Sequence, residues 1–274
     1  DVRWLVNHFW PVPTWTPEMT RLVFHRKRGG SGDVRGTQMA EHFMARQRYH
    51  FRTSRNYPAD WNYDFDVHIW VKMEPEDLEL PGKHYLDVMD ASERMGWILK
   101  NPECGLIAES QSGQKYLMDR TGRDDVHWIK IHHCNFDRVL RSEDAWHTAG
   151  VCGGKGAIQC DVEELKNVLD KHGLTWEWYQ DYKGLDDIVR FYQDRLDVQI
   201  VWRSRTANRP LKDPEKIVNA MSFGIPTIAF PEPGYEELEG YYWPASSMEE
   251  LDSALSELAG GWDRQRLIDK AEEY

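Results

Sequence analysis

The stretch LKDPEKIVNAMSFGIPTIAFPEPGYEEL, residues 211–238, decides the fold prediction because a helix, a buried strand and a second helix start follow one another in it. Asp213 and Pro214 suit the first helix positions, where a side-chain acceptor and a residue that needs no amide partner are favoured. This helix is predicted over residues 214–224, and the apolar strand PTIAFP comes directly after it. Such a succession is typical of a parallel sheet that is covered by helices on both faces.

The same alternation of strands and helices extends over most of the chain. Strands are predicted at residues 21–27, 49–53, 66–72, 84–89, 105–110, 126–133, 146–154, 174–179, 198–203 and 226–231. Helices are predicted at residues 37–47, 91–100, 112–120, 162–173, 185–195, 214–224 and 247–258. A polar segment, 135–146, interrupts the series, and 274 residues suffice for two domains of roughly 130 residues each. We therefore predict two Rossmann-like, doubly wound α/β lobes in tandem, residues 1–143 and 144–274, with a cleft between them.

Polar side chains gather around the strand of the opening stretch. The apolar positions that start at Ile217 form one face of the helix, which leaves Lys216 and Asn219 together on its flank. Ligands of open parallel sheets bind beyond the carboxyl ends of the strands, and amides at a helix start favour anionic groups there. The next helix start is therefore predicted to receive a diphosphate with the residues Gly234, Tyr235 and Glu236.

Two more groups are predicted to face the same edge of the second lobe. Arg203 ends the strand 198–203 and Lys212 follows shortly after it, so a local basic rim is expected in a chain whose net charge is −12. Gly153 and Gly154 end the strand 146–154, where glycine lets the backbone approach a ligand closely. The alternative interpretation of Lys216 is a solvated lysine in the first helical turn. Glu232 is also assigned to this site, and its alternative interpretation is a surface acid.

The segment NAMSFGIPTIAFPEPGYEELE, residues 219–239, resembles the nucleotide-sugar-binding half of GT-B glycosyltransferases, in which a helix with Ala-Met-Ala-x-Gly-x-Pro precedes a strand and a Gly-x-x-Glu turn. The resemblance implies that Lys216 contacts phosphate, that Asn219 binds a ribose and that Glu237 is the glutamate of the turn. Retaining members of the family carry a pair of glutamates where this chain has Leu211 and Asn219. The resemblance also implies that the tail, residues 260–274, packs back toward the first lobe.

The loop GGSGDVRG, residues 29–36, is the corresponding feature of the first lobe. Its glycines miss the Gly-x-Gly-x-x-Gly spacing of a dinucleotide site, and the Gly-Lys-Ser/Thr of a P-loop is absent. The GT-B resemblance implies instead that the loop lines the acceptor side, with the residues Gly30, Ser31, Gly32 and Arg35. Asp33 is a candidate general base, with a turn or helix-cap role as its alternative. His132 and His133 are competing candidate bases.

These patterns predict a glycosyltransferase that moves a sugar from a nucleotide-diphosphate-sugar donor to a carbohydrate or other hydroxyl acceptor, with the nucleotide sugar as co-substrate and no cofactor. A metal is not expected, because the cysteines and histidines lack ligand spacing. Three alternatives stay open: a nucleotide-sugar epimerase of the same fold, a dinucleotide-dependent oxidoreductase and a non-catalytic transferase-like binding module. A nucleic-acid acceptor is a remote option, since the acidic balance argues against a generally basic surface.

The cysteine pattern and the hydropathy bear on the location of the protein. Four cysteines without a Cys-x-x-Cys pair favour reduced thiols over a disulfide framework. The sequence has no apolar stretch of about 18 residues, and its first residues lack the order of a secretory signal. A cytoplasmic protein without a transmembrane segment is therefore expected.

Overall fold

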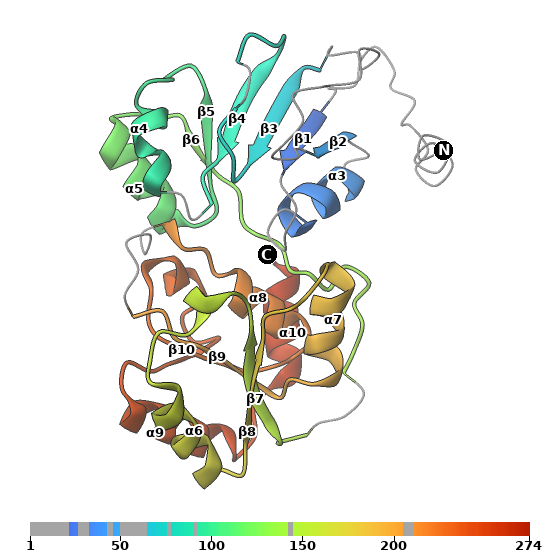
Figure 1. Cartoon of the computed structure of the whole chain (residues 1–274), viewed down its shortest axis with the longest axis vertical. Coiled ribbons are helices and arrows are strands. Elements are labelled where there is room, and N and C mark those ends of the chain that lie inside the picture. The colour runs from blue at the N-terminus through green and yellow to red at the C-terminus, as the bar shows by residue number, and fades with distance from the viewer. Residues whose placement is uncertain are drawn as a thin grey trace.

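The computed structural model describes residues 22–26, 33–42, 46–49, 65–75, 78–89, 92–141, 145–204 and 211–274. Figure 1 shows two lobes, each with its own sheet, joined by the segment that follows β6. The predicted boundary between residues 143 and 144 lies outside the described residues and stays a prediction. None of the helices in the described ranges is long and apolar enough to cross a membrane.

The sheet of the first lobe has six strands in the order β2-β1-β3-β4-β5-β6, and all neighbours pair in parallel. Its strands are β1 Leu22–Arg26, β2 Arg46–Tyr49, β3 Val67–Val71, β4 Lys83–Asp87, β5 Gly105–Ala108 and β6 Val126–Trp128. Its helical segments are η1 Asp33–Gln38, α3 Met39–His42, η2 Ser92–Arg94, α4 Met95–Ile98 and α5 Gln111–Thr121. The side chains of β3, β4, β5 and α5 share one buried apolar cluster, so this face of the sheet is covered by α4 and α5.

Two elements of the first lobe differ from the prediction. The predicted helix 37–47 ends at His42, and an edge strand begins at Arg46, earlier than the predicted strand 49–53. The predicted strand 126–133 stops at Trp128, because the carbonyls of Ile129 and Lys130 accept hydrogen bonds from Arg35. A tertiary contact with an arginine far away in the sequence thus ends a strand whose apolar alternation continues.

The sheet of the second lobe has five parallel strands in the order β11-β10-β9-β7-β8. Its strands are β7 Thr148–Cys152, β8 Thr175–Tyr179, β9 Val198–Val201, β10 Thr227–Ala229 and β11 Trp243–Pro244. Its helical segments are η3 Lys155–Ala157, α6 Val162–Lys171, α7 Leu185–Asp194, α8 Glu215–Ser222, η5 Pro233–Leu238, α9 Met248–Leu258 and α10 Arg264–Glu272. Helices α6 and α9 pack on one face, and α7, α8 and α10 pack on the other.

Local sequence signals account for most helix boundaries in the second lobe. Asp161 caps the start of α6, where its side chain accepts the amides of Glu163 and Glu164, and Gly173 follows the end of α6 with a φ of 69°. Helix α8 begins at Glu215, so Pro214 precedes the helix instead of opening it. Asp213 still accepts the amide of Glu215 at 2.8 Å.

Both sheets follow the same strand order once the strands of each lobe are counted separately, namely 2-1-3-4-5 with a sixth strand added in the first lobe. In this order the ligand crevice lies beyond the carboxyl ends of the first and third strands, here β1 and β3, and β7 and β9. Residues that follow β5 contact residues that follow β10, since α5 packs on η5. The carboxyl edges of the two sheets therefore face each other across the junction of the lobes.

Each lobe also places an apolar side chain in a cluster of the other. Leu211 is 5% exposed and packs with the first-lobe core, whereas Val34 is 1% exposed and packs with residues of α7 and α8. Leu211 stands where the retaining GT-B pattern has a glutamate. Its burial in an apolar core explains why a carboxylate is disfavoured at this position.

Candidate functional site

Lys216, Cys152 and Gly153 meet at the switch point of the second sheet. The Nζ of Lys216 donates a hydrogen bond of 2.9 Å to the carbonyl of Cys152, the last residue of β7. Gly153 has a φ of 152°, and a Cβ built on it would lie 2.9 Å from the same Nζ. Gly154 comes next, and a Cβ there would meet no atom within 4 Å. The structure thus brings together Lys216, Gly153 and Gly154. The absence of a Cβ at Gly153 leaves room for the ammonium group of Lys216 against the backbone.

Arg203, Glu232 and Tyr235 form a buried group beyond the ends of β9 and β10. The Nε of Arg203 donates to Oε1 of Glu232 at 2.7 Å, and a second guanidinium nitrogen donates to the Tyr235 hydroxyl. Glu232 is 4% exposed, so the interpretation as a surface acid is wrong. Burial raises the pKa of Glu232, and the pairing with Arg203 opposes this shift. Glu232 therefore orients the guanidinium of Arg203. Lys212 is half-buried and acts electrostatically on Glu232. The arginines 205 and 209 lie outside the described residues.

The segment Pro233–Leu238 forms a 3-10 helix at the predicted diphosphate position. The amide of Tyr235 donates to the carbonyl of Glu232 at 2.9 Å, so this amide is engaged within the turn. Gly234 packs against the backbone of Lys212, since a Cβ on it would lie 2.0 Å from that carbonyl oxygen. Glu236 is exposed. Of the predicted helix start, Gly234 and the Tyr235 amide are engaged within the protein, and Glu236 is the exposed residue.

Glu237 binds the first lobe. Its Oε1 accepts the amide of Gln111, the first residue of α5, and its Oε2 accepts the hydroxyl of Tyr274 at 2.8 Å. A carboxylate at a helix start is electrostatically favourable, because the first amides of a helix have no partner within it. Glu237 thus links three segments, η5, α5 and the C-terminus, at the junction of the lobes.

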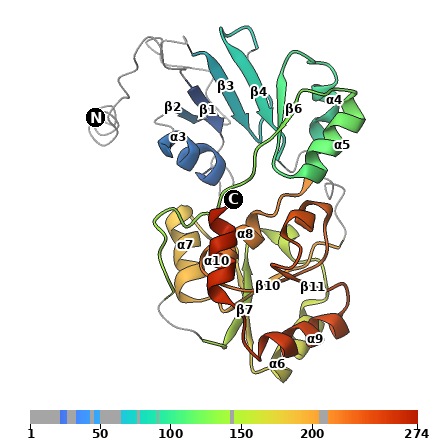
Figure 2. The same ribbon diagram turned by 180° about the vertical axis from the view of Figure 1, so that it is seen from behind.

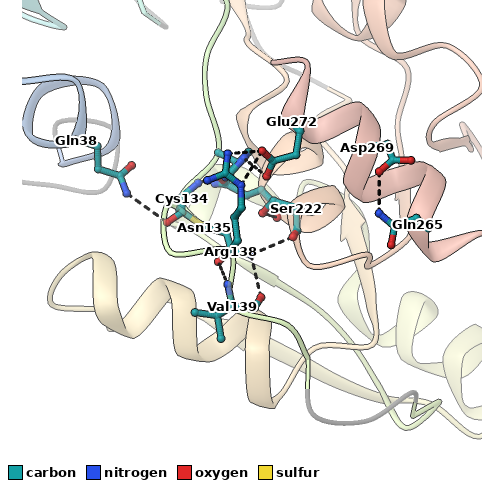
Figure 3. Close-up of polar contacts among 11 residues, drawn as sticks. Gln38, Cys134, Asn135, Arg138, Val139, Ser222, Gln265, Asp269 and Glu272 are labelled. Carbon is teal, nitrogen blue, oxygen red and sulfur yellow. Dashed lines mark hydrogen bonds and ion pairs between the residues drawn. The ribbon is translucent and has the colours of Figure 1, made fainter. Parts of the chain in front are cut away.

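Asn219 comes one helical turn after Lys216 in α8. Its side chain is 5% exposed, and Oδ1 accepts the amide of Cys134 at 2.7 Å. Asn135, the next residue, donates to the carbonyl of Ser222 at the end of the same helix (Figure 3). Asn219 therefore fastens the connecting segment to the second lobe, and a role in ribose binding remains a prediction.

His132 and His133 lie in the connecting segment and face different lobes. His132 Nε2 is 3.2 Å from Oε1 of Gln38 in the first lobe. His133 Nε2 is 3.5 Å from Oε1 of Glu272. The other oxygen of this carboxylate, Oε2, accepts a hydrogen bond of 2.9 Å from Nε of Arg138 (Figure 3). Burial lowers the pKa of His133, and Glu272 opposes the shift. Of the two candidate bases, His132 therefore contacts η1 and His133 contacts α10.

The C-terminal helix ends at the junction. Helix α10 packs along α8, and the Nζ of Lys130 lies 4.6 Å from the ring centre of Tyr274. Figures 1 and 2 both place the C-terminus between the two lobes. The tail, which was expected to pack back toward the first lobe, contacts the segment that leaves that lobe.

On the first lobe, Arg35 is a buried residue of η1 that contacts two carboxylates and two backbone carbonyls. Its Nε lies 2.8 Å from Oδ2 of Asp87 and 3.2 Å from Oε1 of Glu109, and its other nitrogens donate to the carbonyls of Ile129 and Lys130. Gly30, Ser31 and Gly32 lie outside the described residues. Asp33 opens η1, and only its backbone is described.

Asp87 and Glu109 are the polar residues of this edge that the sequence analysis missed. Asp87 is the last residue of β4, and Glu109 directly follows β5. Two acids at the ends of neighbouring apolar strands were a usable signal, because such ends share one edge of a parallel sheet. Burial raises the pKa of Glu109 well above its usual range, and the nearby carboxyls of Asp87 and Asp213 add to the shift.

Within the ranges that the structure describes, no group of three or more histidine, cysteine, aspartate or glutamate side chains is arranged to hold a metal ion. The expectation that the reaction needs no metal is not tested by this arrangement and stays a proposal.

Solved structures with a similar fold include Anabaena HepE (Alr3699), in complex with UDP and glucose. The alignment covers 93% of this chain and 99% of HepE, with a TM-score of 0.57 and 11% identity. The chain has the HepE fold. HepE in complex with UDP-glucose aligns over the same shares with a TM-score of 0.53 and 10% identity. The glycotransferase of kitacinnamycin aligns over 94% of this chain and 96% of its own, with a TM-score of 0.44 and 10% identity. No protein-family model and no curated protein matches the sequence.

The likeness to HepE confirms the predicted fold class, two parallel α/β sheets with flanking helices in tandem lobes. At this low identity it shows the fold alone.

Proposed function

We propose that this protein is a glycosyltransferase that binds a nucleoside-diphosphate sugar at the carboxyl edge of the second sheet and transfers the sugar to a hydroxyl acceptor on the side of the first lobe. The observation that carries the proposal is the position of Lys216 beside Gly153 at the switch point between β7 and β9. A cation next to an unobstructed backbone at this point suits a diphosphate. The crystallised complexes of HepE, which has the same fold, contain UDP with glucose and UDP-glucose.

The residues of this edge would act on the leaving group. As the bond between the sugar and the diphosphate breaks, negative charge grows on the phosphate oxygens, and oriented cations lower the barrier most where charge develops. Lys216 supplies one such cation, and Arg203 supplies another that Glu232 and Tyr235 hold in place. Gly154, where a Cβ would meet no atom within 4 Å, would let the nucleotide lie close to the backbone. The reaction is proposed to proceed without a metal, and Asp33, His132 and His133 remain the sequence-derived candidates for the base.

The test is calorimetric titration of the protein with a panel of nucleotide sugars, followed by the Lys216→Ala variant. We expect Lys216→Ala to weaken binding of the preferred nucleotide sugar by at least tenfold, because it removes a charge-assisted phosphate contact. The matched control is Lys171→Ala, an exposed lysine at the end of α6, which should bind as the wild type does. Equal affinity in wild type and Lys216→Ala would place the donor elsewhere. Turnover of the donor in the absence of any acceptor, with an isomeric nucleotide sugar as product, would instead identify an epimerase.

A further inference from the structure

The junction of the lobes contains a buried group of carboxyls that the donor site does not use. Asp87 and Glu109 come from the first sheet, and Asp213 comes from the segment that starts α8. All three are at most 5% exposed, and each acts electrostatically on Arg35. Arg35 is the cation that pairs with both first-lobe acids. This group lies where the carboxyl edges of the two sheets meet.

Glu109 is placed next to the contact between the acceptor-side lobe and the donor edge. The following residue, Ser110, caps α5, and its Oγ would lie 3.5 Å from a Cβ built on Gly234 of η5. One residue further, the amide of Gln111 donates to Glu237. Glu109 is therefore adjacent in the chain to the point where the first lobe contacts the segment that is proposed to hold the diphosphate.

The hydrogen bonding of Glu109 differs from that of a structural buried acid. Oε2 of Glu109 accepts no hydrogen bond from any residue that the structure describes, although the side chain is only 3% exposed, and its Oε1 has only the ion pair with Arg35. Asp197, an acid of equal burial in the second lobe, accepts from Arg141 with one oxygen and from the amides of His147 and Thr148 with the other. A buried carboxyl oxygen without a donor costs free energy, so its retention points to a ligand group that completes the site.

We propose that Glu109 is the general base of the transfer reaction and binds the attacking hydroxyl of the acceptor through Oε2. In this step the acceptor O–H gives its proton to the Glu109 carboxylate while the acceptor oxygen forms a bond to the anomeric carbon. The bond from that carbon to the diphosphate breaks, and its electron pair leaves with the nucleoside diphosphate. The anomeric centre is inverted. The inference rests on the proposed function, and it selects Glu109 over Asp33, His132 and His133.

Burial suits Glu109 to this role, because a carboxylate with a raised proton affinity removes a hydroxyl proton more effectively near neutral pH. Four groups act on it electrostatically: Arg35 from η1, Asp87 from β4, Asp213 from the segment before α8 and Glu215 from the first position of α8. The three acids raise the pKa of Glu109 together with burial, and Arg35 lowers it. The proposal requires the contact of α5 with η5 to open, so that an acceptor can reach this buried carboxyl.

The experiment uses hydrolysis of the preferred nucleotide sugar, in which water takes the place of the acceptor, together with transfer to an acceptor panel. Glu109→Gln keeps the size of the side chain and removes the base. The matched control is Glu103→Gln, an exposed glutamate before the opposite end of the same strand. We expect Glu109→Gln to lower kcat for hydrolysis and transfer by about 10²–10⁴-fold, with unchanged calorimetric affinity for the donor. Glu103→Gln should match the wild type in both.

Two further readouts separate a base from a structural acid. In the wild type, kcat should fall on the acid side of a midpoint above the ordinary glutamate range, and Glu109→Gln should lack this limb. Glu109→Asp, which keeps a carboxyl, should recover part of the activity. Thermal unfolding identifies a variant that is inactive because it is unfolded.

The outcomes distinguish the two proposals. If the wild type binds no nucleotide sugar, the proposed function fails. If it binds and turns over the donor while Glu109→Gln retains more than a tenth of kcat, or if the product keeps the anomeric configuration of the donor, the role of Glu109 is refuted and the proposed function stands. If the wild type binds the donor but neither hydrolyses nor transfers it, the base assignment is also refuted, and the protein is a binding module.

Discussion

The carboxyl edges of the two sheets have the same topology and opposite electrostatic arrangements. At the second sheet Lys216 contacts a backbone carbonyl, and Arg203 donates to Glu232 and to the Tyr235 hydroxyl. At the first sheet a single arginine, Arg35, pairs with both Asp87 and Glu109. A shared strand order therefore determines where in each lobe a ligand site can lie, but it does not determine the charge of that site. One edge suits an anionic leaving group, and the other suits the uptake of a proton.

The largest expected effect comes from removing the central cation of the first edge. Arg35→Ala would leave two buried carboxyls and two carbonyls without their donor, so we expect a loss of about 3–5 kcal/mol in the free energy of unfolding. Urea unfolding followed by tryptophan fluorescence measures it. Arg203→Ala should cost less, because the Tyr235 hydroxyl still donates to the Glu232 carboxylate when the guanidinium is removed.

Arg138→Ala is the exposed control, since this arginine pairs with Glu272 at the surface, and its unfolding curve should overlay that of the wild type. A cost for Arg35→Ala as small as that of Arg138→Ala would contradict the asymmetry between the two edges.

The second expected effect tests the backbone of the second edge. Gly153→Ala places a side chain at a φ of 152° and against the ammonium group of Lys216. We expect about 1–3 kcal/mol of strain and loss of nucleotide-sugar binding. Gly154→Ala is the matched control for stability, because its φ is −67° and its surroundings are open. Thermal unfolding of both variants and calorimetry of Gly153→Ala give the result, and equal unfolding curves of the pair would argue against a tight site at Gly153.

The third expected effect is the pH dependence of stability that the first edge creates. Because the pKa of Glu109 is raised above its ordinary value of 4.5, the folded protein holds this proton more tightly than the unfolded chain. Stability should therefore fall as pH rises from the ordinary value through the raised one, by up to about 1.4 kcal/mol per pH unit for one proton.

Urea unfolding across this pH range should show a smaller decline in Glu109→Gln than in the wild type. Asp87 and Glu232, whose pKa values burial also raises, leave a residual slope of the same sign. A wild-type stability that rises with pH in this window would contradict a raised pKa of Glu109.

The smallest expected effect concerns the contact that joins the two edges. Glu237→Ala removes the acceptor of the Gln111 amide and of the Tyr274 hydroxyl, which we expect to cost about 0.5–1.5 kcal/mol for each hydrogen bond. Hydrogen exchange at the amide of Gln111 should speed up in Glu237→Ala and stay slow in Tyr274→Phe, which leaves that bond intact. Slow exchange in both variants would show that Glu237 does not hold the lobes together.

Much of the second lobe could be predicted because its signals are local. The capping role of Asp161, the glycine stop at Gly173 and the apolar face of α8 all act within a few residues. The meeting of Lys216 with Gly153 follows from a topology rule that puts strand ends on one edge. The contacts of Glu237 with the first lobe and of Asn219 with Cys134 were beyond reach, since both partners are remote in sequence.

The first lobe was harder for the same reason. Arg35, Asp87 and Glu109 lie on three separate elements, and no spacing in the sequence relates them. The early end of β6 involves Arg35 as well. Its guanidinium donates hydrogen bonds to the carbonyls of Ile129 and Lys130, which lie within the strand predicted over residues 126–133.

The sequence by itself determined the alternation of strands and helices, the two-lobed parallel architecture and the position of Lys216 at a strand edge, because hydrophobic period and capping act over one or two turns. Only the tertiary structure decided which acids are buried, which cation each one meets and which oxygen stays without a donor. Those properties depend on desolvation and on distances between remote segments, and they exist only when the two lobes are folded against each other.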